Sequence, residues 1–237
     1  MFLDLLHRSN WPSQCLICRA WPTATLCQRC VARFADYAPR CATCALPVPE
    51  GLARCGACLR EPPPFDRCLV AASYGWPWTR CISQFKFRQD PGLAAPLAAM
   101  LADAPGVARA LADAELVLPV PLSAQRLAER GYNPAQLLAR QLARRCGNRT
   151  APVRTDLLLR IRHTEPQHGL PRAQRLKNVR GVYATDPLKA PLLRGRRVAL
   201  VDDVMTTGAS LREAALALRA AGAAHITAIA FARTDEP

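Results

Sequence analysis

Hydrophobic residues follow different patterns in the two parts of the chain, and the pattern changes at Cys68. From Cys68 onward, short apolar runs alternate with stretches in which apolar residues recur every three or four positions. The runs predict strands at Cys68–Ser73, Glu115–Val120, Arg197–Val201 and Ile226–Ala232, and the stretches predict helices at Pro91–Ala104, Leu122–Arg145 and Ser210–Ala221. Strands that alternate with helices predict an α/β domain, in which helices cover both faces of a parallel sheet.

One segment of this second part, Leu159–Tyr183, lacks apolar periodicity. It is polar and basic, and it contains Pro166, Gly169 and Pro171. We predict a long loop here. In compact domains, loops of this length are usually functional lids or disordered segments.

The first part of the chain is marked by cysteine. Eight of the eleven cysteines form four Cys-x-x-Cys pairs, Cys15/Cys18, Cys27/Cys30, Cys41/Cys44 and Cys55/Cys58. The two-residue spacer lets both thiolates of a turn face one ion, and two such pairs supply the four tetrahedral ligands of a structural zinc. Eight residues separate the first two pairs and ten the last two, so sequential pairing is easy and crossed pairing stays open. We predict two zinc ions.

Other uses of these thiols compete with zinc: an iron–sulfur cluster, redox dithiols, or one vacant site. Zinc is favoured because the segment has too few apolar residues to fold unaided, and zinc binding stabilises finger peptides by about 10–16 kcal/mol per site. The segment Glu61–Phe65 then carries three consecutive prolines, which stop helix and sheet alike. We therefore predict a double zinc-ribbon domain at residues 1–64 and the α/β domain at residues 65–237.

A strand-to-helix turn near the C-terminus carries the residues best suited to bind a ligand. A buried strand ends in two adjacent carboxylates, Asp202 and Asp203, which are followed by Thr206-Thr207-Gly208-Ala209-Ser210 and a helix. Backbone N–H groups at a helix start, helped by hydroxyl groups, form a cradle for a phosphate dianion. Carboxylates repel phosphate but accept hydrogen bonds from the hydroxyls of a ribose. The turn therefore predicts a ribose 5-phosphate site.

A simpler explanation of the same turn is a capped helix that follows two solvated acids. That explanation accounts for one acid and one threonine, but not for two acids followed by Thr-Thr-Gly-Ala-Ser. A Walker loop is excluded because no Gly-Lys-Ser/Thr occurs, and the Rossmann glycine fingerprint is absent as well.

The chain is basic, with a formal net charge of +14, which favours anionic partners such as phosphates or nucleic acid. Only three of the 32 basic residues are lysines, so a biased composition explains the charge equally well. Lys86 lies among Trp76, Trp78, Phe85 and Phe87, a mixture that can stack on single-stranded bases, although core packing is the simpler explanation.

Neither a membrane span nor a signal peptide is evident in the sequence. No stretch approaches the roughly 20 apolar residues that a bilayer requires, and the first eight residues have no basic leader or cleavage site. We expect no membrane insertion and a cytoplasmic location.

Several motifs of this chain occur together in one known family. They are the four cysteine pairs, the acid-pair loop, Pro119-Val120-Pro121-Leu122 followed by Arg126, Arg130, Gly131, Tyr132 and Asn133, and Thr164, Gln167, Leu170, Arg175, Asn178, Val179 and Gly181 in the basic loop. Over nearly all of its 237 residues the chain resembles the ComF family of competence proteins (also called GntX), which join an N-terminal zinc ribbon to a type I phosphoribosyltransferase domain.

This resemblance implies a ligand, phosphoribosyl pyrophosphate (PRPP) with Mg²⁺, and a role for each motif. Asp202 and Asp203 would hold the ribose hydroxyls, and Thr206, Thr207, Gly208, Ala209 and Ser210 the 5-phosphate. Val120, Pro121 and Leu122 would hold the pyrophosphate, and the Leu159–Tyr183 loop would close over the substrate. Arg175 on that loop would act in catalysis with the acid pair, because the departing pyrophosphate needs cations and exclusion of water.

Three functions remain open from the sequence. The first is a phosphoribosyltransferase, a pentosyl-transferring enzyme, with an unknown acceptor. The second is a PRPP-binding module without turnover that acts in DNA uptake or processing, with single-stranded DNA and a competence helicase as partners. The third is a zinc-ribbon DNA-binding protein whose nucleotide loop has become structural, and the intact acid pair argues against it. The oligomeric state is open as well.

Overall fold

A computed structural model describes residues 13–35, 38–88, 90–147, 151–162 and 180–235. The chain forms two compact units, Met1–Ala35 and Asp36–Pro237. The domain boundary expected at residue 64 stays a prediction about which parts fold independently. Among the helices of the described ranges, none has the length and apolar character of a membrane span.

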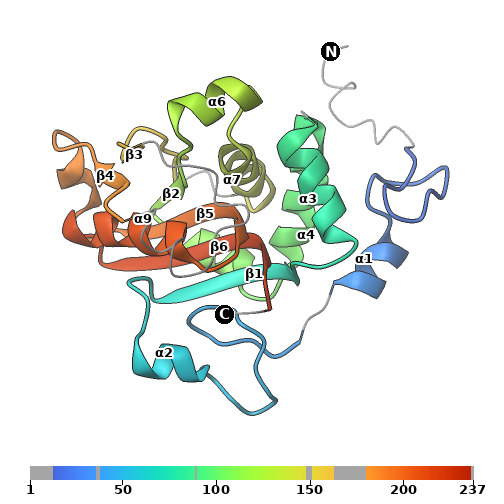
Figure 1. The fold of residues 1–237 in the computed structure, drawn as a ribbon, viewed down its shortest axis with the longest axis horizontal. Helices are drawn as coiled ribbons and strands as arrows, with labels where there is room; N and C mark the ends of the chain where they lie inside the picture. The colour runs from blue at the N-terminus through green and yellow to red at the C-terminus, as the bar shows by residue number, and fades with distance from the viewer. Residues whose placement is uncertain (1–12, 36–37, 89, 148–150, 163–179, 236–237) are drawn as a thin grey trace. The chain divides into compact units, whose positions relative to one another are not determined.

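The larger unit is built on a parallel four-stranded sheet with the order β1-β6-β5-β2 (Figure 1). Its strands are β1 (Arg67–Ser73), β2 (Leu116–Pro119), β5 (Arg197–Met205) and β6 (His225–Arg233). All four predicted strands are therefore present. Strand β5 continues beyond its predicted end at Val201, because its pairing with β6 extends as far as Met205 and Arg233. The two acids thus belong to the strand itself.

Helices cover both faces of this sheet, as expected. Helices α4 (Ala94–Asp103) and α7 (Pro134–Arg145) pack against each other and against one face, and α9 (Ala209–Ala220) packs on the other face (Figure 1). Each buries an apolar stripe, so that the interior of β5 is fully enclosed. This layering confirms the predicted α/β fold class.

The helix predicted over Leu122–Arg145 was wrong as a single element. The structure has two helices, α6 (Ala124–Arg130) and α7, which are separated by a turn. Gly131 ends α6 in the left-handed conformation with a φ of 79°. The side chain of Asn133 then caps α7 by accepting hydrogen bonds from two backbone N–H groups, ahead of a proline at the first helical position.

Several short elements were not predicted. They are the helices α3 (Trp78–Phe87) and α5 (Val107–Asp113), the 3-10 turn Ala190–Leu193, and the antiparallel strands β3 (Leu158–Arg160) and β4 (Tyr183–Thr185). The helix predicted at Pro91–Ala104 begins with a 3-10 turn, Pro91–Leu93, that leads into α4. The strands correct the prediction of a loop over Leu159–Tyr183, because both ends of that segment are paired in a β-ladder. Residues 163–179 between them lie outside the described ranges.

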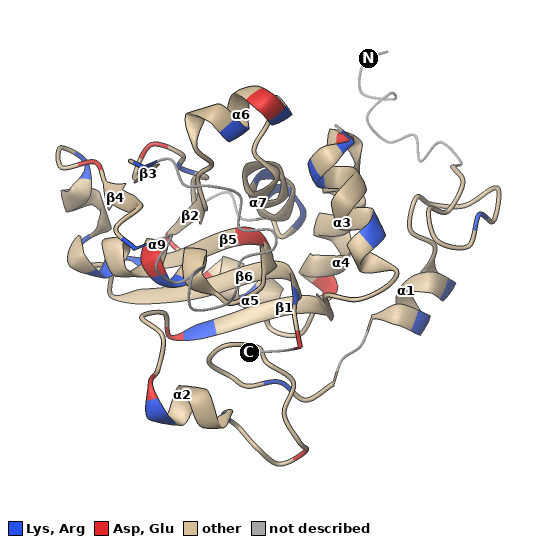
Figure 2. Cartoon of the chain, in the orientation of Figure 1, with Lys and Arg blue, Asp and Glu red and all other residues tan. Residues whose placement is uncertain are grey.

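Lysine and arginine are spread over the elements of the larger unit. They occur on α3, α6, α7 and β1, among others (Figure 2). The net charge therefore does not come from one basic helix.

Candidate ligand site and metal centres

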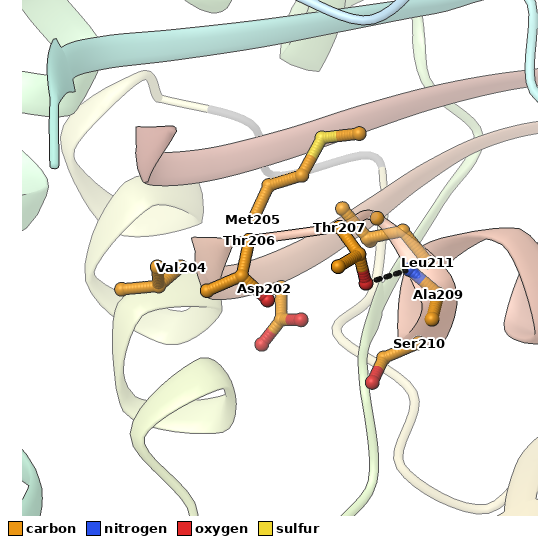
Figure 3. A pocket seen from close by; sticks show the side chains of 9 residues that line it. Asp202, Val204, Met205, Thr206, Thr207, Ala209, Ser210 and Leu211 are labelled. Atoms are coloured by element: carbon orange, nitrogen blue, oxygen red, sulfur yellow. Dashed lines mark hydrogen bonds between the residues drawn. The ribbon is translucent and has the colours of Figure 1, made fainter. Parts of the chain in front are cut away.

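The predicted phosphate loop turns the chain from β5 into α9 and, with Asp202, lines a small cavity of about 20 Å³. Gly208 has a φ of 76°, and a Cβ there would meet the end of the Met205 side chain, so this position favours glycine. The hydroxyl of Thr207 accepts a hydrogen bond from the Ala209 N–H at 3.3 Å. The Asp202 carboxylate and the Ser210 hydroxyl lie on the same side of the loop, and Met205 points to the other side (Figure 3).

The loop can offer hydrogen-bond donors to an anion. The first N–H groups of a helix have no acceptor within it, and the Ala209 N–H at the start of α9 donates to the Thr207 hydroxyl. The loop residues Thr206, Thr207, Gly208, Ala209 and Ser210 all line the cavity, and their role in binding a phosphate stays a prediction. A hydroxyl-lined cradle beside a carboxylate can hold a phosphate and a neutral sugar together.

The two carboxylates of the acid pair are buried to different degrees, and one of them pairs with a lysine. Burial and, next, the charge of Asp203 raise the pKa of Asp202 to about 7, against the opposing charge of Lys86. Asp203 is 8% exposed, and its Oδ1 lies 2.6 Å from the Nζ of Lys86 on α3. The Asp203 N–H also donates to Asp202 Oδ1 at 2.8 Å. The sequence did not reveal Lys86 as part of this site, because helix α3 was not predicted.

The segment Val120-Pro121-Leu122 lies beside the acid pair. The Val120 N–H donates to the carbonyl of Val201, the residue before Asp202, at 2.8 Å. The carbonyl of Val120 in turn accepts from the side-chain amide of Asn133 at 3.0 Å. The predicted pyrophosphate loop is therefore held between β5 and the N-terminus of α7, at the same edge of the sheet as the phosphate loop.

A basic cluster formed by Arg126, Arg130 and Arg160 lies near the phosphate loop. Sequence analysis named Arg126 and Arg130 but not Arg160. The guanidinium of Arg160 on β3 lies over the ring of Tyr183 on β4, 5.6 Å from its centroid. Burial lowers the pKa of Arg126 on α6, and the charges of Arg160 and Arg130 lower it further. Burial also raises the pKa of Tyr183, which interacts with Asp202 and with the Ser210 side chain. Tyr183 thus interacts both with the arginines of this cluster and with residues of the phosphate-loop region.

Only the two ends of the predicted lid, Leu159–Tyr183, lie within the described residues. Arg162 is described and exposed. The predicted catalytic residue Arg175 lies outside the described residues, as do Arg172, Lys177, His163 and His168. Its catalytic role stays a prediction.

Arg233 joins the phosphate loop to the second pair of cysteine knuckles. This residue ends β6 and is 4% exposed. Its guanidinium donates to the carbonyls of Cys44, Met205, Thr206 and Thr234 and to the Thr234 hydroxyl. Among the described residues, it forms no ion pair with a carboxylate; carbonyl oxygens compensate its buried charge. Sequence reasoning missed this residue, since an arginine near a C-terminus gives no signal of its own.

The eight paired cysteines form two groups of four. Cys15, Cys18, Cys27 and Cys30 come together in one group and Cys41, Cys44, Cys55 and Cys58 in the other, with the sulfurs of each group within 4.8 Å of one another. The Sγ atoms of Cys18 and Cys27 are 3.7 Å apart and those of Cys44 and Cys55 3.6 Å. Four sulfurs at about 2.3 Å from a tetrahedral zinc are separated by about 3.8 Å. Both groups fit zinc, and pairing is sequential.

The two groups share one construction. In each, the residue after the first knuckle is left-handed, with a φ of 65° at Arg19 and 57° at Ala45. In each, the second knuckle begins a short helix, α1 (Gln28–Phe34) or α2 (Gly56–Arg60). Burial would raise the thiol pKa of Cys15 and Cys41, but backbone N–H donors outweigh it and lower the values to about 6 and about 7. Backbone donors therefore favour a thiolate in both groups.

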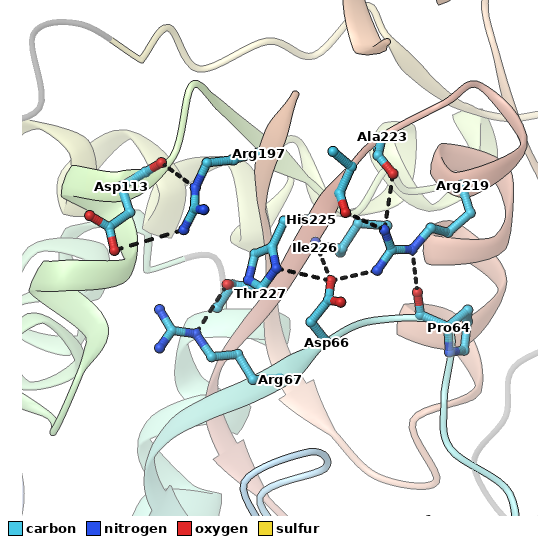
Figure 4. Close-up of polar contacts among 11 residues, drawn as sticks. Pro64, Asp66, Arg67, Asp113, Arg197, Arg219, Ala223, His225, Ile226 and Thr227 are labelled. Atoms are coloured by element: carbon cyan, nitrogen blue, oxygen red, sulfur yellow. Dashed lines mark hydrogen bonds and ion pairs between the residues drawn. The ribbon is translucent and has the colours of Figure 1, made fainter. Parts of the chain in front are cut away.

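The surroundings of the two groups differ. The second group belongs to the same apolar core as the sheet strands of the larger unit. The proline-rich connector after the second group, Glu61–Phe65, also packs against this unit. Phe65 is 2% exposed, and the carbonyl of Pro64 accepts a hydrogen bond from Arg219 on α9 (Figure 4). Arg219 also donates to the Asp66 carboxylate, which accepts from the Ile226 N–H and pairs with His225 (Figure 4).

Comparisons with known proteins agree with this architecture. A double zinc ribbon domain matches residues 4–59, and a phosphoribosyl transferase domain matches residues 127–236. The chain is 31% identical over 232 residues to the DNA utilization protein YhgH of Salmonella typhimurium, covering 94% of this chain and 98% of that protein. It is 33% identical over 211 residues to the Competence protein F of Haemophilus influenzae, covering 88% and 90%. A YhgH of Escherichia coli is 30% identical over 234 residues, covering 94% and 98%.

The chain belongs to the competence protein F family. The match to the YhgH of Salmonella typhimurium covers 94% of this chain, and the two domain matches include both cysteine groups and the part of the sheet from residue 127 onward. The double zinc ribbon with its two four-cysteine clusters supports structural zinc in this family member.

Substituting one cysteine in each group should separate the roles of the two metal centres. Cys58→Ser should remove one zinc ion and lower the melting temperature of the larger unit by about 5 °C or more, because its group lies in that unit's core. The matched variant Cys15→Ser should also remove one zinc but leave that transition in place. Metal analysis and melting curves test this, and equal shifts in both variants would contradict it.

Arg233 should be far more important for stability than Arg212, a half-buried arginine that pairs with an exposed glutamate. Arg233→Met leaves several buried carbonyls without their donor and should lower the free energy of unfolding by about 2–4 kcal/mol. Arg212→Met, which removes only a pairing with the exposed Glu61, should cost less than about 1 kcal/mol. Urea unfolding gives both values, and a loss no larger in Arg233→Met than in Arg212→Met would refute the prediction.

Proposed function

We propose that this chain binds PRPP with Mg²⁺ at the edge of the sheet where β2 and β5 end, and that it serves DNA uptake or nucleotide-linked processing in the cytoplasm. The observation that carries the proposal is the convergence there of the acid pair, the hydroxyl-lined loop and the Val120 segment. Parallel α/β sheets bind their ligands at this edge. In this proposal Asp202 and Asp203 accept hydrogen bonds from the ribose hydroxyls, and residues 206–210 hold the 5-phosphate.

The chemistry of the proposed ligand fits the charges nearby. In transfer, the acceptor's lone pair forms a bond to the anomeric carbon as the C–O bond to pyrophosphate breaks, and that bond's electron pair leaves with pyrophosphate. The guanidinium groups of Arg126 and Arg160 are suited to stabilise this leaving charge. Mg²⁺ prefers oxygen ligands and usually binds one or two carboxylates plus phosphates, which an acid pair beside a pyrophosphate would offer.

Two modes of action share these contacts. One is phosphoribosyl transfer to an acceptor, which the phosphoribosyl transferase domain supports. The other is a PRPP-binding module without turnover that contacts DNA, a mode supported by the names of the relatives, DNA utilization protein and Competence protein F, and by the net charge of +14. Pyrophosphate release during incubation with PRPP, Mg²⁺ and each common nucleobase distinguishes the first mode from the second.

The acid pair gives the direct test of PRPP binding. Asp202→Asn with Asp203→Asn keeps shape and removes two charge-assisted acceptors of about 1.5–3 kcal/mol each, so PRPP affinity should fall at least about a hundredfold. Calorimetric titration of PRPP with Mg²⁺ measures it. The double variant Asp103→Asn with Asp113→Asn, on exposed helix positions, makes the same change in net charge and should bind like the wild type.

Stability of the single variant Asp202→Asn separates a binding role from a structural one, because it keeps the ion pair of Lys86 with Asp203. Because folding raises the pKa of Asp202 from 3.8 to about 7, its ionisation in the folded protein costs stability that grows as pH rises through this range. Above pH 7, Asp202→Asn should therefore melt no lower than the wild type in the absence of ligand. A large loss of stability with unchanged affinity would refute the proposal, as would a wild-type chain that binds no PRPP.

Binding to DNA should be weak and electrostatic if the basic charge is functional. We expect association with single-stranded DNA at low salt that declines steeply as salt increases, because neutralised phosphates release counterions. Fluorescence anisotropy with a labelled oligonucleotide measures it, and an oligomer of the same sequence with an uncharged backbone is the control. Absence of binding at low salt, or binding that salt does not change, would favour a compositional origin of the charge.

A further inference from the structure

Lys86 has the position of a ligand-site residue, although its own helix contributes nothing else to the site. Its Nζ lies 2.6 Å from Asp203 Oδ1, and the side chains are only 20% and 11% exposed. An ion pair this sheltered from water is screened far less than a surface pair. An ammonium group has three N–H donors, so the bond to Asp203 leaves Lys86 able to donate further hydrogen bonds.

The surroundings of Lys86 fix its backbone. Phe85 is fully buried, its ring centroid lies 6.0 Å from that of Tyr132, and its carbonyl accepts a hydrogen bond from the Tyr132 hydroxyl. On the other side of Lys86, the guanidinium of Arg130 lies 5.1 Å from the ring centroid of Phe87. The last turn of α3 is thus attached to the turn between α6 and α7, the same turn whose Asn133 holds the Val120 carbonyl. The ammonium group therefore reaches Asp203 from a fixed point.

The acid pair needs a cation for an electrostatic reason. Two adjacent ionised carboxylates repel each other, and they also repel a polyanionic ligand. Among the charges that shift the pKa of Asp202, that of Asp203 raises it and that of Lys86 lowers it. The Lys86 ammonium, 2.6 Å from Asp203 Oδ1, therefore offsets part of the negative charge that the acid pair presents to a polyanionic ligand.

We propose that Lys86 is a positioning residue of the ligand site, which holds one carboxylate oxygen of Asp203 so that the second oxygen accepts a ribose hydroxyl. The inference rests on the proposed role of the acid pair. It adds to the site a residue from α3 and gives Phe85 and Phe87 the role of fixing the last turn of that helix. Loss of the Lys86 ammonium should then weaken the ligand because Asp203 loses the partner that orients it.

The test compares three variants by calorimetric titration of PRPP with Mg²⁺ at one neutral pH. Lys86→Met should weaken binding about ten- to hundredfold, because Asp203 loses its partner. Lys86→Arg, which keeps the charge and can still donate to Asp203, should recover most of the affinity.

The control is Arg80→Met, which removes one positive charge from an exposed position of the same helix. It should bind PRPP like the wild type. Equal affinities of Lys86→Met and Arg80→Met would overturn the role of Lys86 while the wild type still binds PRPP. An affinity in Lys86→Arg as low as that in Lys86→Met would overturn it too. If Lys86→Met does not fold, Lys86→Gln replaces it under the same criteria; a wild type that binds no PRPP refutes the proposed function itself.

Discussion

The buried guanidinium of Arg233 is the constraint on which the candidate site depends. A turn that exposes its N–H groups to an anion must direct its carbonyls elsewhere, and buried carbonyls need donors. Arg233 supplies them to Met205 and Thr206 from the end of the neighbouring strand. The same group also binds the carbonyl of Cys44 in the second cysteine group. One planar, permanently charged side chain thus fixes the back of the phosphate loop, which a lysine could not do with one compact ammonium.

The front of the site follows from the way charges are balanced along β5. Placing two acids inside a paired strand removes them from water, and the raised pKa of Asp202 is the direct result. Such an arrangement is unfavourable for folding and is tolerated because Lys86 compensates one charge. The site is thus less stable without a ligand than a neutral strand end would be. Strain of this kind is typical of positions kept for binding.

Much of this architecture could be predicted from local sequence. Strands β1, β2, β5 and β6 have continuous apolar runs, and the phosphate loop places its acids, hydroxyls and glycine next to each other. The cysteine spacing predicted two four-thiol groups because each knuckle is a local turn. These features could be predicted because the residues that interact in them are neighbours in the chain.

The residues that sequence reasoning missed act across long separations. Lys86 reaches Asp203, Arg233 reaches Cys44, and Arg160 meets Tyr183 only because the sheet and the β3–β4 pair bring them together. Helix α3 was not predicted, although core packing was the favoured interpretation of the aromatic residues in and beside it. The break between α6 and α7 was readable in principle, since Gly131 and Asn133 carry ordinary stop and start signals. Apolar periodicity continued through them and concealed the turn.

The two cysteine groups show how one local motif can take different roles in one chain. Their knuckles, left-handed residues and short helices are alike, so the local cost and gain of binding a metal should be similar. What differs is what lies beyond the sulfurs. The first group is surrounded by a small cluster that includes Ile17 and Phe34, whereas the second continues into the core of the sheet. A metal in the second group would therefore stabilise Cys44 and, through Arg233, the turn that we propose receives the phosphate. The same four-cysteine set would thus stabilise only its own surroundings in the first group, and the candidate ligand site as well in the second.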